Sequence, residues 1–421
     1  MRVVFATFSE RTHFYSMVPL AWAMRTAGHE VRIASQPELT PTVVQAGLTA
    51  VPVGTDHTLY DDMADFRDDV AAAEWFELDE DRPEKLTWEY LKWGYGTQLV
   101  PDWWRIINDT MTDDLTAFCR EWGPDLVVWE PMTYAGAVAA EASGAVHARL
   151  LWGLDLFGRM RAHYLRVMAQ QPPGQREDPL AQWLAEAGKP HGVGFTEAMA
   201  SGHFTVHQHP ASLALDVDLD YLPMRYVPYN GPARVPDWLR EPPERPRVCV
   251  TLGTSATDRL GGYEVPVHEV VDALADVDAE IVVTLAADQQ EGLARVPANT
   301  RIVEFVPLHA LLPSCSAIVH HGGSGTHLTA ALNGVPQLVL PWLLDAPAKG
   351  RRLAELGAGL CLEGEEITGS GIRAGVVRLL ADPSFRDRSA RLRREILAQP
   401  SPNDVVTQIE RRVARLAAAR A

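Results

Sequence analysis

The apolar and polar positions of the chain follow a repeated strand-and-helix rhythm. Residues 2–7 (RVVFAT) form a short β-rich run. Residues 14–27 then carry apolar side chains at helical spacing until Gly28, which predicts a strand followed by a helix that stops there. The rhythm returns in residues 29–35, 124–130, 135–143 and 145–152. Strands that alternate with helices predict a parallel, doubly wound sheet.

A second region with the same rhythm follows a proline-rich stretch. Residues 226–246 hold six prolines, which predicts a linker between domains. Two such halves predict an α/β protein with two Rossmann-like domains that face each other across a cleft. In the second half we expect strands at 247–253, 279–285, 300–306, 316–321 and 336–341, and helices at 263–276 and from near Thr326.

The length of 421 residues suits two domains, each with a core of its own. The predicted parts are a first domain at 1–225 with a helical insertion at about 55–120, the linker at 226–246, a second domain at 247–400, and a helical tail at 401–421.

The insertion is acidic and rich in Trp and Tyr. Two interpretations of its aromatic side chains stay open. They pack helices onto the sheet, or they line a hydrophobic acceptor site or a partner surface, because clustered aromatic residues often form such sites. The tryptophans concerned are Trp75, Trp88, Trp93, Trp103 and Trp104.

Charge and cysteine content narrow the classes of partner. The formal net charge of −17 would repel a phosphate backbone, so nucleic acid is a poor candidate and an anionic ligand needs local donors. The four cysteines are scattered without a CxxC pair, which argues against a disulfide framework or a structural zinc site and suits a reducing cytoplasm. We expect neither a signal peptide nor a membrane span, because the apolar runs are too short.

The segment HHGGSGT stands between a predicted strand and a predicted helix. Glycines there let backbone N–H groups approach an anion, and the amino end of a helix adds positive potential. It is neither a Walker motif nor GxGxxG, and no GxGxxG opens the first half, which disfavours a nicotinamide or flavin oxidoreductase. The alternative is a tight turn that merely needs glycines. The candidate phosphate ligands are His321, Gly322, Gly323, Ser324, Gly325 and Thr326.

A second glycine turn ends the first strand of the second half. Gly253, Thr254 and Ser255 follow this strand, and loops at the carboxyl ends of parallel strands are where such sheets bind ligands. The two hydroxyls are candidates to donate to the same diphosphate. The alternative is an ordinary helix cap.

His13 and Glu130 are candidates for acid–base chemistry. His13 lies just beyond the first strand, and Glu130 ends the PDLVVWE strand. A hydroxyl acceptor needs a base that titrates near neutral pH, which is the natural range of histidine, and a carboxylate improves such a base by fixing its tautomer. The pairing requires that the two strands are neighbours. Taken singly, each residue is also compatible with a cap or surface role.

The chain resembles the bacterial antibiotic-modifying glycosyltransferases of the GT-B fold, especially those that attach deoxysugars to macrolide and anthracycline aglycones. The resemblance implies that the first domain binds the acceptor and the second binds the nucleotide sugar. The segments that carry it span nearly the full length: residues 18–40, 50–57, PDLVVWEPMTYAGAVAA at 124–140, MRYVPYNGP at 224–232, FVPLHALLPSCSAIVHHGGSGT at 305–326, and VPQLVLP at 335–341.

The resemblance assigns roles by position. His13 stands where the family has its general base, and Glu130 where the family usually has an Asp partner. His321 and the backbone of residues 323–326 would hold the diphosphate, with Thr254 assisting. Phe305 would present its ring, and Val306 its backbone, to the pyrimidine.

Two departures from the family pattern point to the donor. Relatives that use UDP-glucose place a Glu where this chain has Thr329, which suits a 2′-deoxyribose and hence dTDP. The same relatives grip glucose with an Asp-Gln pair, and here that pair is Asp345-Ala346, which suits a dideoxy or amino sugar. Asp345 would then meet a sugar hydroxyl or ammonium. The alternative for both positions is drift.

These features predict an inverting transfer from a dTDP-sugar to a hydroxyl of a polyketide-type aglycone, without a metal. The Asp-rich stretches 216–220 and 276–280 fall in predicted loops and are more consistent with solvated turns than with a metal site. The resemblance also implies a P450-like activator protein as partner, for which residues 55–120 are the candidate docking surface, and it leaves a homodimer open. Two further functions stay open: a non-catalytic dTDP-sugar-binding partner of another transferase, and an epimerase of the same fold.

Overall fold

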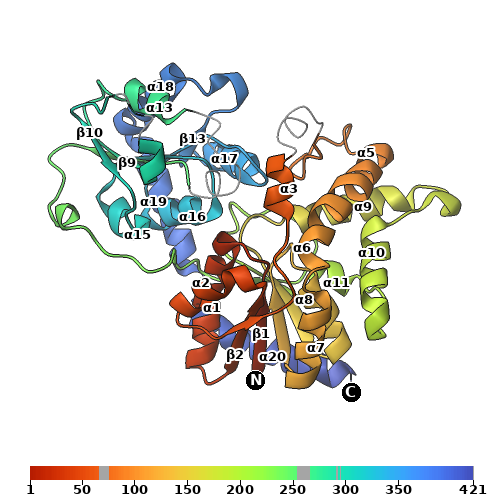
Figure 1. The fold of residues 1–421 in the computed structure, drawn as a ribbon. Coiled ribbons are helices and arrows are strands. Elements are labelled where there is room, and N and C mark those ends of the chain that lie inside the picture. The colour runs from red at the N-terminus through yellow and green to blue at the C-terminus, as the bar shows by residue number, and fades with distance from the viewer. Residues whose placement is uncertain (66–74, 254–265, 291–292, 294, 421) are drawn as a thin grey trace. The chain divides into compact units, whose positions relative to one another are not determined.

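The computed structural model describes residues 1–65, 75–253, 266–290, 293 and 295–420 (Figure 1). The chain forms two compact units. The first comprises Met1–Gln208, Ala214–Met224 and Pro400–Ala421, and the second His209–Leu213 and Arg225–Gln399.

The first unit is built on a parallel sheet of seven strands in the order β3-β2-β1-β4-β5-β6-β7. The four strands and both helices expected at the start of the chain and around residues 124–152 are confirmed, and the helix predicted at 135–143 has these bounds as α8. The strands are β1 (Arg2–Ala6), β2 (Glu30–Ser35), β3 (Ala50–Pro52), β4 (Leu126–Trp129), β5 (Val146–Leu150), β6 (Thr205–His207) and β7 (Tyr221–Pro223).

Helices cover both faces of this sheet, with α1 and α2 on one side of β1 and α7 and α8 on the other (Figure 1). The helices are α1 (Arg11–Thr26), α2 (Thr40–Gln45), α3 (Leu59–Asp65), α5 (Trp88–Trp93), α6 (Ile106–Asn108), α7 (Thr112–Trp122), α8 (Ala135–Ser143), α9 (Leu156–Ala169), α10 (Pro179–Gly188), α11 (Ala198–Ser201) and α20 (Pro402–Arg420), with a π-helical segment at Gly94–Arg105.

The second unit repeats the plan with six parallel strands in the order β10-β9-β8-β11-β12-β13. The strands are β8 (Arg247–Thr251), β9 (Glu280–Thr284), β10 (Thr300–Val303), β11 (Ala317–His320), β12 (Gln337–Val339) and β13 (Gly359–Cys361). The helices are α13 (Val267–Ala273), α14 (Ala287–Gln290), α15 (Leu308–Leu311), α16 (Ser324–Asn333), α17 (Ala346–Glu355), α18 (Gly369–Ala381) and α19 (Pro383–Ala398).

The core of the second unit shows why the middle residues of its strands are apolar. Val248 and Val250 of β8 point into a cluster with α13 and α18, and Cys249 points into a separate cluster with α15 and α16. Successive side chains of a strand face opposite sides of the sheet, so a sheet covered by helices on both sides needs apolar residues at successive positions in the middle of its strands.

Each sheet has one place where the strand order reverses. In the first unit the chain runs outward from β1 in one direction and from β4 in the other, and β1 pairs with β4 in parallel. In the second unit the same reversal separates β8 from β11. The loops at the carboxyl ends of the strands on either side of such a switch point are the usual ligand-binding place of an open α/β sheet.

The last helix of the chain packs on the first unit. Glu410 of α20 lies 3.0 Å from His29, and Arg412 donates to Asp220 at 2.9 Å. The C-terminal residues therefore consist of two helices, α19 in the second unit and α20 in the first.

In the insertion, Trp88 and Trp104 are buried and Trp104 packs on Tyr95 and Tyr134, so both stabilise the first unit by packing. Trp75 stays 37% exposed. The packing interpretation therefore holds for Trp88 and Trp104.

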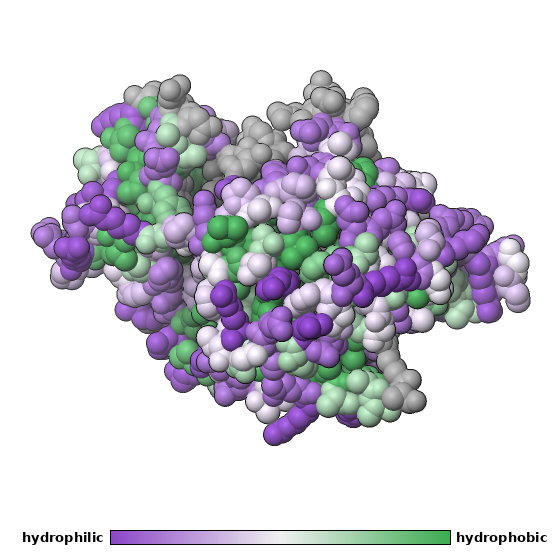
Figure 2. Space-filling model, turned by 60° about the horizontal axis from the view of Figure 1, so that its bottom comes forward, coloured by the Kyte–Doolittle hydropathy of each residue, from purple (hydrophilic) through white to green (hydrophobic). Residues whose placement is uncertain are grey.

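The surface seen in Figure 2 is hydrophilic over most of its area, with apolar residues in small scattered patches. Within the described part of the chain, no helix combines the length and apolar character needed to cross a bilayer.

Candidate active site

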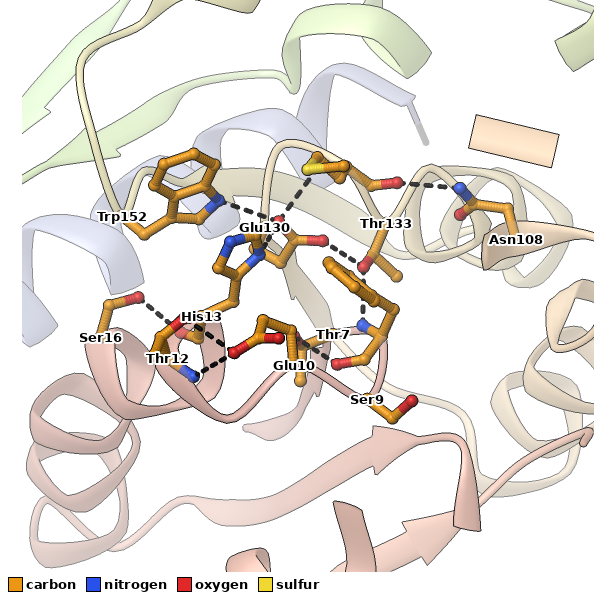
Figure 3. A network of polar contacts seen from close by, with 12 residues as sticks. Thr7, Ser9, Glu10, Thr12, His13, Ser16, Asn108, Glu130, Thr133 and Trp152 are labelled. Carbon is orange, nitrogen blue, oxygen red and sulfur yellow. Dashed lines mark hydrogen bonds and ion pairs between the residues drawn. The ribbon is translucent and has the colours of Figure 1, made fainter. Parts of the chain in front are cut away.

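His13 and Glu130 meet at the switch point of the first sheet (Figure 3). β1 ends at Ala6 and α1 begins at Arg11, so His13 lies in the first turn of the helix. Glu130 directly follows β4, the parallel neighbour of β1. His13 Nδ1 lies 3.2 Å from Glu130 Oε2. The pairing depended on these strands being neighbours, and that condition is met.

The Glu130 carboxylate is completely buried and receives several hydrogen bonds. Met132 donates its backbone N–H at 3.1 Å, Trp152 donates its indole N–H at 3.1 Å, and the Thr133 hydroxyl donates to the other oxygen. Buried carboxylates need such partners because removing a charge from water is costly. These donors hold the carboxylate in one orientation, with one oxygen directed at His13.

The His13 ring is fixed from two sides. Trp152 stacks on it with ring centroids 4.4 Å apart, and Phe8 meets it edge-on at 5.1 Å. Only 12% of the His13 side chain is exposed. Because Nδ1 donates its hydrogen to Glu130, the lone pair of a neutral ring stands on Nε2. This is the arrangement of a general base supported by a carboxylate.

The HHGGSGT segment occupies the switch point of the second sheet. β11 ends at His320 and α16 begins at Ser324, so the glycines form the turn between them. The turn is held by His320, whose Nδ1 accepts from the N–H of Gly322 at 3.0 Å, while its Nε2 donates to Gln337 at 2.8 Å. The loop thus has the strand-to-helix placement of an anion cradle.

Two glycines give the His321 ring its space. A Cβ on Gly253 would lie 2.4 Å from the ring, and one on Gly323 would lie 2.5 Å from it. Gly253 also has a φ of +81°, which disfavours any other residue. The structure therefore brings Gly253 and the His321 cradle together, as expected from the sequence.

His321 is a neutral group at physiological pH. Burial, followed by the positive charge of Lys349, lowers the pKa of His321 to about 4, against a smaller raising effect of a hydrogen bond with the Thr251 backbone. Its Nδ1 atom is buried without a hydrogen-bond partner among the described residues. A neutral imidazole carries one hydrogen, and with that hydrogen on Nδ1 the ring can donate to a ligand oxygen in the cradle.

Lys349 is a buried cation directly behind the cradle. Its ammonium donates to Ser324 Oγ at 2.6 Å and forms an ion pair with Asp345 at 2.8 Å. Its side chain is 1% exposed. Burial lowers the pKa of Lys349, and the charge of Asp345 opposes that shift.

The remaining predicted donor residues fall around the same loop. Thr329 is buried in α16, donates to the Gly325 carbonyl at 2.6 Å and lies 3.1 Å from the Tyr226 hydroxyl. Phe305 is 48% exposed, whereas its neighbour Val306 is buried. Thr254 and Ser255 lie outside the described residues.

The acidic stretches do not form a metal site in the described part of the chain. Three of their carboxylates pair with arginines instead, in the contacts Asp220–Arg412, Asp276–Arg373 and Asp278–Arg245.

One other group, Glu141, His147 and His203, brings three candidate ligand atoms within 4.8 Å of one another. Trp129 donates its indole N–H to His147 Nδ1, so the neutral His147 carries its hydrogen on Nε2 and donates it to Glu141 at 3.0 Å. A metal at this nitrogen would have to displace that hydrogen, so the group is better described as a hydrogen-bonded cluster.

Both halves of the chain match one protein family. Residues 22–253 match the family "Erythromycin biosynthesis protein CIII-like, N-terminal domain", and residues 268–411 match its C-terminal domain. The chain is 49% identical over 421 residues to the 10-deoxymethynolide desosaminyltransferase of Streptomyces venezuelae, which covers 99% of this chain and 98% of that protein. It is 48% identical over 428 residues to the aklavinone 7-beta-L-rhodosaminyltransferase of Streptomyces galilaeus, with 99% and 96% covered. The chain belongs to this family of glycosyltransferases.

The fold of this glycosyltransferase also has a close solved counterpart. The structure of the glycosyltransferase VinC in complex with dTDP has a TM-score of 0.89 and 46% identity, and covers 99% of this chain and 100% of that one. The predicted membership of the GT-B glycosyltransferases, and the predicted α/β fold with two Rossmann-like domains, are thereby confirmed.

Three residues of the glycosyltransferase's site were not predicted from the sequence. Trp152 and Thr133 hold His13 and Glu130, and Lys349 lies behind the cradle. Trp152 ends a predicted strand and Thr133 follows Glu130 by three residues, so their place at the same sheet edge was available as a signal. Lys349 gave no such signal, because a lone lysine in a helix is ordinarily a surface residue.

Gly253→Ala is expected to weaken dTDP binding about 10-fold or more, because the new Cβ displaces the His321 ring and removes a ligand hydrogen bond. Gly28→Ala is the matched control: Gly28 has a φ of +91°, but a Cβ there meets nothing within 4 Å. Both variants should lose about 1–2 kcal/mol of unfolding free energy to backbone strain. Calorimetric titration with dTDP, beside thermal denaturation, separates the two effects. Equal dTDP affinity in the two variants would contradict the assignment.

Proposed function

We propose that this glycosyltransferase moves a deoxysugar, of the amino or dideoxy class, from a dTDP-sugar to a hydroxyl of a polyketide-type aglycone with inversion at the anomeric carbon. The observation that carries the proposal is the hydrogen bond between His13 and the buried Glu130. A protein that only bound a sugar nucleotide would have no need of a base oriented in this way. This favours the enzyme over the non-catalytic alternative.

In the proposed reaction, His13 Nε2 accepts the proton of the acceptor hydroxyl while the oxygen forms its bond to the anomeric carbon. The bond from that carbon to the dTDP oxygen breaks in the same step, and dTDP leaves with its electron pair. Glu130 stabilises the imidazolium that results. His321, the N–H groups at the start of α16 and Thr254 stabilise the charge that grows on the diphosphate, which is commonly the largest contribution to such a rate.

Several observations support the donor. VinC, 46% identical, has a structure in complex with dTDP, and two relatives are named for desosaminyl and rhodosaminyl transfer. Thr329 carries no charge for a ribose hydroxyl to meet, and its own hydroxyl is occupied by Gly325 and Tyr226. We assign Phe305 and Val306 to the pyrimidine, and Asp345 to the sugar end of the donor site.

The proposal includes independence from metals, because Lys349 and the amino end of α16 already supply positive potential at the cradle. It places the enzyme in the cytoplasm, in keeping with its four free cysteines. It also includes a P450-like activator protein that docks on residues 55–120, whose acidic surface includes the half-exposed Trp75. The proposal is compatible with a homodimer.

A thermal-shift screen against dTDP, UDP and GDP tests the donor, and a transfer assay with chelator present tests the reaction. We expect the largest stabilisation with dTDP, and release of dTDP coupled to glycoside formation. Binding of a ligand raises the melting temperature in proportion to the logarithm of its concentration over its Kd. A preference for UDP would contradict the Thr329 argument. An activator arm completes the assay: a full rate from the purified chain, unchanged by such a protein, would contradict the docking proposal.

A further inference from the structure

Lys349, Ser324 and Asp345 form a buried polar group that the proposed reaction does not yet use. Lys349 Nζ lies 2.6 Å from Ser324 Oγ and 2.8 Å from Asp345 Oδ1. Lys349 and Asp345 are 1% and 4% exposed. Lys349 is thus among the largest fully buried side chains of the described residues. A buried ammonium is rare because its desolvation is costly. Its position behind the cradle therefore indicates a role in that site.

The hydrogen bonds of this group fix the direction in which Ser324 can donate. A lysine ammonium has only donors, so Ser324 Oγ must be the acceptor of the 2.6 Å contact. The hydroxyl hydrogen of Ser324 is therefore left for another acceptor. The second oxygen of Asp345 lies 3.5 Å from Ser324 Oγ, which is too long for a good O–H···O bond. Ser324 is the first residue of α16, so its hydroxyl stands at the amino end of the helix.

The charges around the cradle also indicate a role for Lys349 in binding an anion. His321 stays neutral at physiological pH, because burial and the charge of Lys349 hold its pKa at about 4. The chain as a whole carries a formal charge of −17. An anion at the cradle must therefore find positive charge locally. Lys349 adds the charge of its ammonium, which the ion pair with Asp345 at 2.8 Å partly offsets, to the partial charges of the helix.

We propose that Lys349 is a positioning residue for the diphosphate of the donor: its ammonium holds Ser324 so that the serine hydroxyl donates to a diphosphate oxygen, and its charge offsets the negative charge of the departing nucleotide. Asp345 holds Lys349 in this position. The inference rests on the proposed function, since it takes the cradle to bind the donor diphosphate.

The test compares two ligands that differ only in the diphosphate. Kd values for dTDP and for thymidine are measured by calorimetric titration for the wild type, Ser324→Ala and Lys349→Met, with Lys189→Met at an exposed position as the matched control. We expect dTDP to bind about 10- to 100-fold more weakly in the first two variants, the range for a lost hydrogen bond to a charged group. Thymidine binding should stay within about 2-fold in all of them, a tolerance of about 0.4 kcal/mol. A double variant should lose little more than the weaker-binding single variant, because both act through one hydroxyl.

The ratio of the two affinities separates the proposal from a merely structural role, which would weaken both ligands together. A ratio of thymidine to dTDP Kd that is unchanged in Ser324→Ala would overturn the proposal, even if Lys349→Met failed to fold. A wild type that bound dTDP no better than thymidine would instead overturn the phosphate site and with it the proposed donor.

Discussion

Replacing His13 with alanine is expected to lower kcat for sugar transfer by about 10²- to 10⁴-fold, the usual contribution of a general base. The variant loses the base but should keep its fold. Glu130 would still accept from Met132, Trp152 and Thr133, so no buried carboxylate is left without partners. The affinity for dTDP should be unchanged, because the cradle belongs to the other compact unit.

Turnover and dTDP binding are therefore measured separately on the same His13→Ala preparation. His268→Ala, at an exposed histidine of α13, serves as the control and should retain the full rate. Imidazole in the buffer should restore part of the lost rate, since the space beside Trp152 can receive it. Loss of both turnover and dTDP binding would indicate a structural role for His13. Retention of turnover would show that His13 is not the base, and a wild type that binds dTDP without transferring sugar would favour the non-catalytic alternative.

The sequence predicted the fold well because its strands are buried on both sides. Apolar runs such as the VCV of β8 and the AIV of β11 suit a parallel sheet that is covered on both faces, and the helices between them set the order of the elements. The sequence predicts the ends of elements less accurately. β10 stops at Val303, three residues before the predicted end at 306, because Pro307 and the loop before it lead into α15.

The pairing of His13 with Glu130 could be predicted because the order of the strands determines it. Each follows a strand, and two parallel neighbours bring their carboxyl ends together whatever the rest of the chain does. The roles of Trp152 and Lys349 could not be predicted in this way. Trp152 depends on the rotamer that lets one indole both stack on His13 and donate to Glu130, and Lys349 depends on a burial that its residue type argues against.

The two candidate sites follow one physical rule. Each lies where the strand order of its sheet reverses, β1 against β4 and β8 against β11. At such a point the two loops diverge to opposite faces and leave backbone and side chains accessible at the sheet edge. The first sheet places a base there and the second an anion cradle. The same architecture thus serves the two halves of a displacement reaction.

Glu130→Gln is expected to lower kcat by about 10²- to 10³-fold while the protein keeps its fold. The amide oxygen can still accept from His13, Met132 and Trp152. Its NH₂ group would face Thr133 Oγ, which already accepts from the Phe8 N–H and can turn its own hydrogen away. The variant therefore keeps the tautomer of His13 and loses mainly the negative charge that stabilises the imidazolium.

Glu130→Asp separates the charge from its placement. Aspartate keeps the charge but draws it back by one methylene from His13, to which the present distance is 3.2 Å. We expect its kcat to lie between those of the wild type and Glu130→Gln, with the KM for the dTDP-sugar unchanged in both. Steady-state rates over a range of pH provide the measurement. A Glu130→Gln enzyme with the wild-type kcat would show that the carboxylate only orients His13, and a raised donor KM would show that it acts on the donor instead.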